Sequence, residues 1–242
     1  MRSSCSRCRR RAERRPGTMR NYIRKSFYLI VVFCISLAQA SSYNDFFRAI
    51  RSDNPRALES LFARGFDPNT VDPEGRSPLS LAFHYEAYAA ALALVRHPEF
   101  RFDEPNAAGE TPLMLAALRG QVALSRELLV RGAQLNRPGW TPLHYAASGS
   151  EPRLVDMLIG HGAPLDALAP NGNTPLMMAA RHGSEAGAWI LLKAGAHPGL
   201  RNRDGLTAAD FARSVERVNL ATEIERLASM RAARPDSVSE SR

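Results

Sequence analysis

The chain has 242 residues, of which 45% are hydrophobic and 23% charged, and its formal net charge is +8 at pH 7. A charge of this size would favour nucleic acid or an anionic membrane as a partner. The charge is unevenly distributed, however. Residues 1–40 contain ten Lys or Arg and one acid, Glu13, whereas residues 41–242 contain 22 basic and 23 acidic side chains. The sequence after residue 40 therefore predicts no nucleic-acid partner.

Residues 1–40 have the features of an export signal. A basic segment with Arg24 and Lys25 precedes an apolar run of twelve residues, 27–38. Ala38-Gln39-Ala40 then matches the small-x-small pattern of a cleavage site. Twelve apolar residues are too few to span about 30 Å of hydrocarbon. We expect cleavage after Ala40 and no stable membrane insertion afterwards; a buried core helix and an N-terminal anchor are the alternatives.

The same region holds a second methionine and every cysteine. Met19 directly precedes the basic segment, so we expect translation to start at Met19 rather than Met1. Cys5, Cys8 and Cys34 all lie in the part expected to be removed. The Cys5-x-x-Cys8 spacing occurs in metal and redox sites, but no second pair and no βαβ pattern accompany it. The sequence therefore predicts no metal site for the exported chain.

Residues 41–73 predict two helices that cap the N-terminal end of the later repeats. The first contains Phe46 and Phe47, and Asn54-Pro55 begins the second, because Pro is favoured at the first helical position. Leu58 and Leu61 share one face of that second helix. A terminal unit needs an apolar surface on one side only, which fits this segment.

Residues 109–132 contain the clearest repeating unit. Thr111 is expected to be a helix N-cap with Pro112 at the first helical position, and Gly120 ends this short helix. A second helix from Val122 places its leucines on one face until Gly132. The pair has one apolar stripe per helix and cannot cover both, so it needs a similar neighbour on each side.

The same helix start recurs along the chain. It reads SPLS at 77–80, TPLM at 111–114, TPLH at 141–144, TPLM at 174–177 and TAAD at 207–210, with starts 34, 30, 33 and 33 residues apart. We expect about six stacked units over residues 41–231, of which the first and last are caps. Residues 232–242 are short and polar, and we expect them to be disordered.

A period near 33 with TPLH-like starts and LLxxGA-like ends resembles the ankyrin repeat family. The resemblance covers roughly Asp45 to Met230. It implies an all-α fold, an ankyrin-repeat solenoid of stacked helix-turn-helix units with short hairpin-like fingers, whose concave side binds proteins. The connector before the fourth unit is about three residues shorter than the others. We therefore expect a shortened finger there, with Trp140 near its tip.

The resemblance also indicates where a partner would bind. In the family, contact residues lie on the fingers and at the exposed end of the inner helix. Carried onto this sequence, these positions are Arg76, His84, Tyr85, Glu110, Leu118, Arg119, Trp140, Asn173, Arg181 and His182. Trp, Tyr and Arg commonly dominate binding energy at protein interfaces. Trp140 has a second interpretation, in which its ring covers a gap between two repeats.

No catalytic motif is present. The sequence lacks GxSxG, a P-loop, HExxH and a dinucleotide-binding fingerprint. The six histidines follow the repeat period, and helices packed on one another are roughly 10 Å apart, too far for a shared metal ion. The resemblance implies that His144 hydrogen-bonds to the backbone of a neighbouring repeat, and Asp210 is expected to be a local cap or ion-pair partner. The sequence predicts no catalytic residue, metal or cofactor.

Three classes of function remain. The first is a monomeric, non-catalytic module that binds another, unidentified protein in the periplasm. The second is a secreted effector that binds a host protein through the same face. The third is an enzyme with an unrecognised site. The export signal favours the first class.

Overall fold

The computed structural model describes residues 41–233. The expected export signal, the Met19 start and the three cysteines lie outside the described residues, as do residues 234–242. The chain divides into two compact units, Met1–Asp45 and Phe46–Arg242. Of the first unit only residues 41–45 are described, and they are helical.

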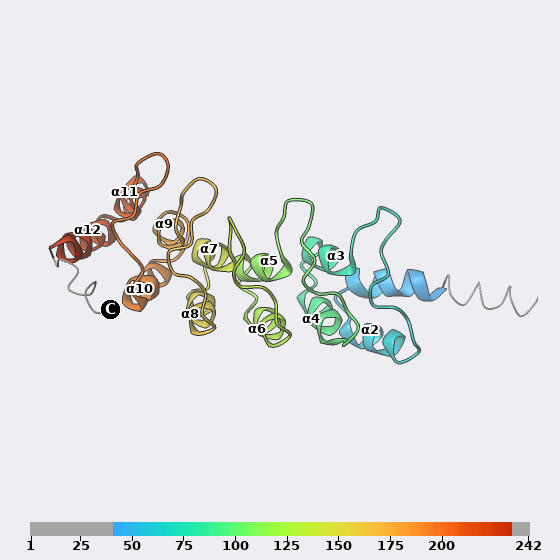
Figure 1. Cartoon of the computed structure of the whole chain (residues 1–242). Helices are drawn as coiled ribbons and strands as arrows, with labels where there is room; N and C mark the ends of the chain where they lie inside the picture. Colours follow the sequence, from blue (N-terminus) through green and yellow to red (C-terminus); the bar gives the residue numbers. More distant parts are fainter. Residues whose placement is uncertain (1–40, 234–242) are drawn as a thin grey trace, which may run out of the picture. The chain divides into compact units, whose positions relative to one another are not determined.

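Short helices follow one another throughout residues 46–233, and these residues contain no strand. Residues 46–51 are helical, and the later helices are α2 (Pro55–Phe62), α3 (Pro78–His84), α4 (Tyr88–Arg96), α5 (Pro112–Leu118), α6 (Val122–Val130), α7 (Pro142–Ser148), α8 (Pro152–Gly160), α9 (Pro175–Arg181), α10 (Glu185–Ala194), α11 (Ala208–Ser214) and α12 (Val218–Ala232). We call α3, α5, α7, α9 and α11 the inner helices and the even-numbered helices the outer helices. Residues 46–51 and α2 form the first repeat, and each inner helix with the outer helix after it forms one of the second (α3–α4) to sixth (α11–α12) repeats (Figure 1).

The inner helices begin in the same way because the same side chains recur at their starts. The hydroxyl oxygens of Ser77, Thr111, Thr174 and Thr207 each accept a hydrogen bond from the backbone N–H three residues later, at 3.2 to 3.3 Å. Pro follows directly at α3, α5, α7 and α9. The hydroxyl satisfies one of the N–H groups that a helix start leaves unpaired. The repeated Thr-Pro therefore fixes where each repeat begins.

The repeats stack in sequence order. Each inner helix contacts the next inner helix, from α3 to α11, and each outer helix contacts the next from α2 to α10. Leu113, Leu143 and Leu176 are fully buried at equivalent positions of α5, α7 and α9. Burial of such a leucine is worth roughly 1.5–3 kcal/mol, and a single helix pair needs neighbouring repeats to cover its apolar side chains. The predicted all-α stack of helix pairs is confirmed.

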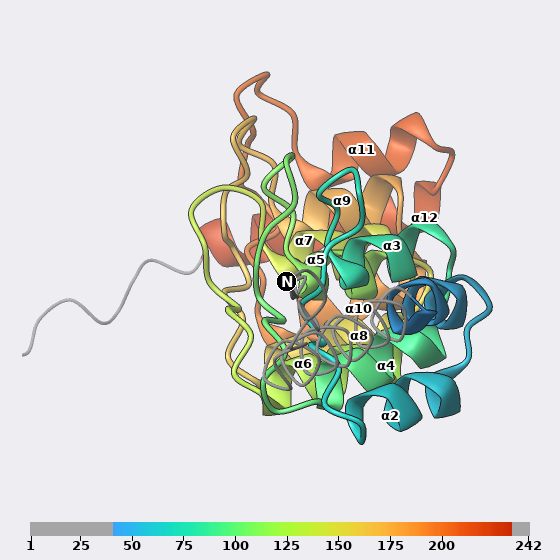
Figure 2. The ribbon, with the colours of Figure 1, turned by 90° about the vertical axis from the view of Figure 1, so that its right-hand side faces the viewer.

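Connecting loops, here called fingers, link the repeats at residues 67–76, 101–110, 134–140, 164–173 and 197–206, and lie together on one side of the inner helices (Figure 2). In four of them a glycine N–H donates to the carbonyl oxygen three residues earlier: Gly75 to Asp72, Gly109 to Asn106, Gly172 to Ala169 and Gly205 to Asn202. The finger at 134–140 is shorter than the other four, bends at residues 138–140 and has Gly139 at φ 88°. The predicted shortened finger is therefore present.

Within residues 41–233, no helix has both the length and the apolar character needed to cross a membrane.

Candidate functional site

A buried polar link under the fingers joins the fourth and fifth repeats. The backbone N–H of Thr141 donates to Nδ1 of His144 at 3.2 Å, so this imidazole carries its proton on Nε2. Nε2 donates to the carbonyl oxygen of Asn173 at 3.0 Å. Burial lowers the pKa of His144, against the opposing effect of the Asn173 bond, and this keeps the ring neutral. The inter-repeat bond expected for His144 is present.

Asn173 does not lie on the exposed surface, so the expectation that it faces a partner is corrected. Its side chain is 8% exposed, and its Oδ1 accepts a hydrogen bond from Nδ2 of Asn202 at 2.9 Å. Its carbonyl oxygen is the one that His144 binds. Finger position alone predicted exposure, but this amide is turned inward, where it joins the fifth and sixth repeats.

The arginines of the first two fingers and of the α5 end are paired with carboxylates. Nη2 of Arg76 lies 2.6 Å from Oδ2 of Asp72. Burial raises the pKa of the Asp72 carboxyl, but the hydrogen bonds from Arg76 outweigh this and hold that pKa below its ordinary value. Arg119, just after α5, lies 3.0 Å from Glu86, which follows α3. Arg76 and Arg119 are exposed as predicted, but their charges are balanced within the chain.

Glu110 connects two repeats rather than facing solvent freely. It is half-buried, its Oε1 accepts from the hydroxyl of Tyr145 at 3.0 Å, and its Oε2 accepts from Nδ2 of Asn106 at 2.8 Å. Burial, followed by this bond to Glu110, raises the pKa of Tyr145 to about 12. The Glu110 carboxylate therefore has an internal role in linking the third and fourth repeats.

Exposed apolar side chains lie at the ends of α3 and α5. Tyr85 is 43% exposed, and its ring packs edge-on against His84, with centroids 4.9 Å apart. Leu118 ends α5, as His84 ends α3, and is 38% exposed. Tyr85, Leu118 and His84 are all exposed, as the sequence predicted.

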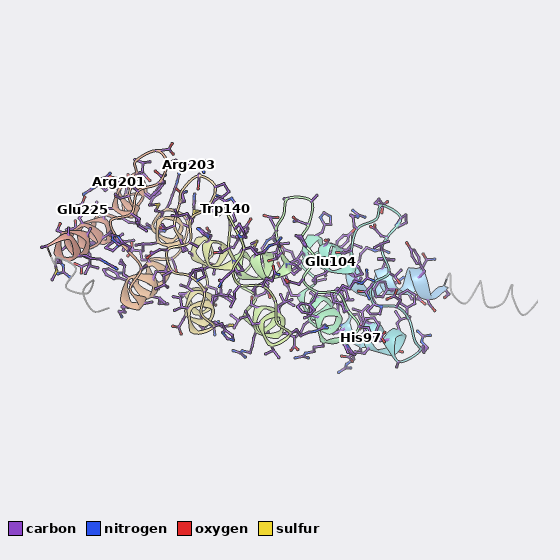
Figure 3. The ribbon with its side chains drawn as sticks, viewed as in Figure 1. His97, Glu104, Trp140, Arg201, Arg203 and Glu225 are labelled. Carbon is purple, nitrogen blue, oxygen red and sulfur yellow. The ribbon has the colours of Figure 1, made fainter. Side chains whose placement is uncertain are left out.

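Trp140 of the shortened finger lies against its own repeat (Figure 3). Its ring packs edge-on against those of His144, at 5.4 Å, and Tyr145, at 6.3 Å, both on α7. The side chain is half-buried. A half-buried ring is not fully displayed at a finger tip, and its described ring contacts place it against α7 of its own repeat.

Arg181 and His182 lie exposed at the end of α9. The guanidinium of Arg181 lies 5.4 Å from the ring centroid of Phe211 on α11, a cation–π arrangement. Burial lowers the pKa of His182, and the positive charges of Arg181 and Arg217 lower it further. Arg217 itself donates to the carbonyl oxygens of Ala179 and Gly183 at 3.0 and 2.7 Å. Two positive charges, those of Arg181 and Arg217, therefore act at the end of α9.

Besides Arg101, which pairs with Glu104, three further finger arginines were not among the predicted contacts, namely Arg137, Arg201 and Arg203. Arg201 and Arg203 belong to the last finger, where Figure 3 labels both. The available signal was their position, because each lies in a finger just as Arg76 does. The sequence does not show which arginines pair with carboxylates. Arg76 does so, whereas these three form no ion pair with the described residues.

A cavity of about 1080 Å³ lies between the last finger and α12. Several of its polar lining groups already have partners in the chain. Arg201 donates to the carbonyl oxygen of Gly205, Arg231 donates to that of Gly195, and Glu225 pairs with Arg213. In the part of the chain that the structure describes, no three His, Cys, Asp or Glu side chains are placed to hold a metal ion. Asp210 bonds to Thr207 and pairs with Arg213, as expected of a local cap.

Comparison with known proteins agrees with this architecture. The chain is 24% identical over 194 residues to an ankyrin repeat protein of Escherichia coli (strain K12), YahD; the match covers 63% of this chain and 96% of that protein. It is 29% identical over 203 residues to protein glp-1 of Caenorhabditis elegans, covering 76% of this chain and 15% of glp-1. It is 35% identical over 174 residues to the tyrosine-protein kinase Shark of Drosophila melanogaster, covering 70% of this chain and 18% of that protein.

The similarity to the two animal proteins is thus confined to small parts of them, since the chain spans less than a fifth of either. The family model for ankyrin repeats in three copies matches residues 46–138 and 127–202. These ranges contain the helix pairs up to α10, the Thr-Pro starts and most of the fingers, whereas α11 and α12 lie beyond them. The chain therefore belongs to the ankyrin repeat family, whose repeats form protein–protein interaction modules.

Proposed function

We propose that this chain is a non-catalytic binding module that is exported to the periplasm and there holds one protein partner against its fingers and inner-helix ends. The proposal rests on one observation: Tyr85 and Leu118 are large apolar side chains that lie exposed on this surface and are not part of the buried core. Desolvated aromatic side chains provide much of the binding energy in protein interfaces.

The helix pairs behind this surface support the same conclusion. Their leucines are buried between repeats, so the fold does not depend on Tyr85 or Leu118 for its core. Changes at the exposed surface can therefore alter binding without unfolding the stack. The proposed location rests on the sequence of residues 20–40, with its basic segment, apolar run and cleavage pattern.

Binding is tested with a double substitution, Tyr85→Ala/Leu118→Ala, in the tagged chain used to capture proteins from an envelope extract. The partner enriched by the unaltered chain should bind the double variant at least about tenfold more weakly, since two contact side chains are removed. The readout is mass spectrometry of the captured proteins, followed by calorimetry with the purified partner.

Val130→Ala is the matched control, because Val130 is 75% exposed at the end of α6, an outer helix. It should leave capture unchanged. Equal capture by all three proteins would place the interface elsewhere. Location is tested separately by fractionation and N-terminal sequencing, where a cytoplasmic product, or a start far from Ser41, would contradict export.

A further inference from the structure

The finger and inner-helix surface differs in charge between its two ends. In the second and third repeats, residues 67–86 and 100–119 carry seven carboxylates and three arginines. In the fourth to sixth repeats, residues 134–149, 164–182 and 197–216 carry five arginines and four carboxylates. The surface therefore changes from clearly acidic to slightly basic along the stack.

Ion pairing within the chain increases the difference between the two ends, because most arginines of the acidic end are paired with carboxylates and most of those at the other end are not. In the second and third repeats Arg76, Arg101 and Arg119 each lie within 4.0 Å of a carboxylate. In the later repeats Arg213 is paired in this way, with Asp210 and Glu225. No ion pair within 4.0 Å joins Arg137, Arg181, Arg201 or Arg203 to a carboxylate of residues 41–233. We call these four residues the arginine surface.

Two contacts place part of this surface at one junction. The backbone N–H of Arg203 donates to the carbonyl oxygen of Asn171 at 3.1 Å, which joins the last finger to the one before it. Arg181, at the end of α9, lies over Phe211 of α11. Both arginines therefore belong to the junction of the fifth and sixth repeats. The lowered pKa of His182, caused by burial and then by Arg181 and Arg217, is consistent with excess positive charge there.

We propose that the arginine surface binds an acidic segment of the partner protein, with Arg181 and Arg203 as its principal contacts. The inference rests on the proposed protein-binding function and adds the chemistry of the partner. Guanidinium groups bind carboxylates in a two-pronged geometry and need no further proton transfer. An arginine that forms no ion pair within the described residues has this capacity available, whereas Arg76 and Arg119 already use it within the chain.

Charge arrangement favours a protein segment over nucleic acid or an anionic membrane. Double-stranded DNA carries one negative charge per about 1.7 Å, and proteins that bind it do so with a strongly basic patch or stripe. Here Asp204, Asp210 and Glu216 lie among the arginines, and the neighbouring repeats are acidic. A uniformly charged polyanion would be repelled by these carboxylates. A short acidic segment can bind the arginines and avoid them.

The inference is tested by fluorescence anisotropy with the full chain and a labelled ten-residue peptide rich in Asp and Glu. The comparison is between Arg181→Gln/Arg203→Gln and the control Arg76→Gln/Arg119→Gln, which removes the same charge from paired arginines. We expect the first variant to bind the peptide about tenfold more weakly and the control to change affinity less than about twofold, with weaker binding at higher salt.

Several outcomes would overturn the inference. They are failure of the unaltered chain to bind the acidic peptide, equal losses in both variants, equal binding of a peptide with Gln and Asn in place of the acids, and preferential binding of a single-stranded oligonucleotide or of phosphatidylglycerol vesicles. The capture experiment separates this inference from the proposed function. A partner captured equally by the unaltered chain and by Arg181→Gln/Arg203→Gln would refute the acidic contact but leave protein binding intact.

Discussion

The junction between the third and fourth repeats differs from the two junctions after it. It is bridged by Tyr145 and Glu110, which are only partly buried, and it adjoins the shortened finger. The two later junctions contain the buried His144 bond to Asn173 and the buried Asn202 bond to Asn173. Arg217 adds hydrogen bonds to three carbonyl oxygens of the fifth repeat.

This difference shows that repeats with similar sequences can be attached to one another quite differently. Hydrogen bonds shielded from water contribute more to the free energy of unfolding than those at the surface. Removing one partner of a shielded bond also costs more, because the other partner is left buried and unpaired. We therefore expect the last three repeats to behave as the more stable part of the stack, and changes at their junctions to have the largest effects.

The largest effect is expected for Gly183→Ala, at the junction of the fourth and fifth repeats. A Cβ at this position would lie 1.8 Å from the carbonyl oxygen of Ala147 in the preceding repeat, so the two repeats must separate. The free energy of unfolding should fall by about 3 kcal/mol or more, measured by urea denaturation.

The control for this change is Gly160→Ala, because Gly160 ends α8 and an added Cβ would meet nothing within 4 Å. A methyl group there should be neutral or stabilise the helix by up to about 1 kcal/mol. A loss of stability in Gly160→Ala as large as that in Gly183→Ala would show that close packing at the junction is not the cause.

Arg217→Ala is expected to have the next largest effect. It leaves the carbonyl oxygens of Ala179, Ala180 and Gly183 without their charged donor, so the free energy of unfolding should fall by about 2–3 kcal/mol. Arg119→Ala, which breaks an exposed ion pair with Glu86, should change it by less than about 1 kcal/mol. Thermal unfolding curves of the two variants measure the difference, and equal effects would contradict the larger contribution expected at the later junctions.

Among the three changes at the later junctions, His144→Met should have the smallest effect on stability at neutral pH. Methionine occurs at the equivalent positions 114 and 177, where its sulfur lies 3.4 Å from the backbone nitrogen of the N-cap threonine. The substitution therefore keeps the local acceptor but removes the donor to Asn173. We expect the free energy of unfolding to fall by about 1–2 kcal/mol, as measured by urea denaturation at pH 7.5.

The same variant tests a pH dependence. Burial holds the pKa of His144 below its ordinary value of 6.5, so the unfolded chain binds a proton at a higher pH than the folded chain does. The stability that His144 contributes is therefore complete above pH 6.5 and is lost as the pH falls through 6.5 toward the folded-state pKa. Denaturation between about pH 7.5 and about pH 5 should show a smaller loss of stability in His144→Met than in the unaltered chain; parallel curves would contradict this.

Much of the fold could be predicted from the sequence because the helix starts carry their own signals. Thr111 and Pro112 act locally, through a side-chain bond three residues away and a fixed backbone angle, and their repetition indicated both the period and the stack. The shortened finger was predicted from a count of residues. The domain limits at residues 40 and 231 and the capping roles of the end repeats stay predictions.

The candidate site was less predictable because pairing depends on neighbours one repeat away. The sequence places Asn173 on a finger, but its contact with Asn202, 29 residues later, turns it inward. Arg119 and Arg181 lie at the ends of their inner helices, yet Glu86 pairs with the first, whereas the second lies over Phe211. Such distinctions arise from three-dimensional contacts that a repeat motif does not encode.

The shortened finger has a consequence for the spacing of binding groups along a ligand. The fingers at 101–110 and 164–173 lie on either side of it and are separated by two repeats rather than one. An extended ligand with one binding group per repeat would have no full-length finger to contact at the fourth repeat, so its middle group would lack a binding site. We therefore expect a ligand with two anchoring segments and a spacer between them, so that shortening the spacer alone would weaken its attachment.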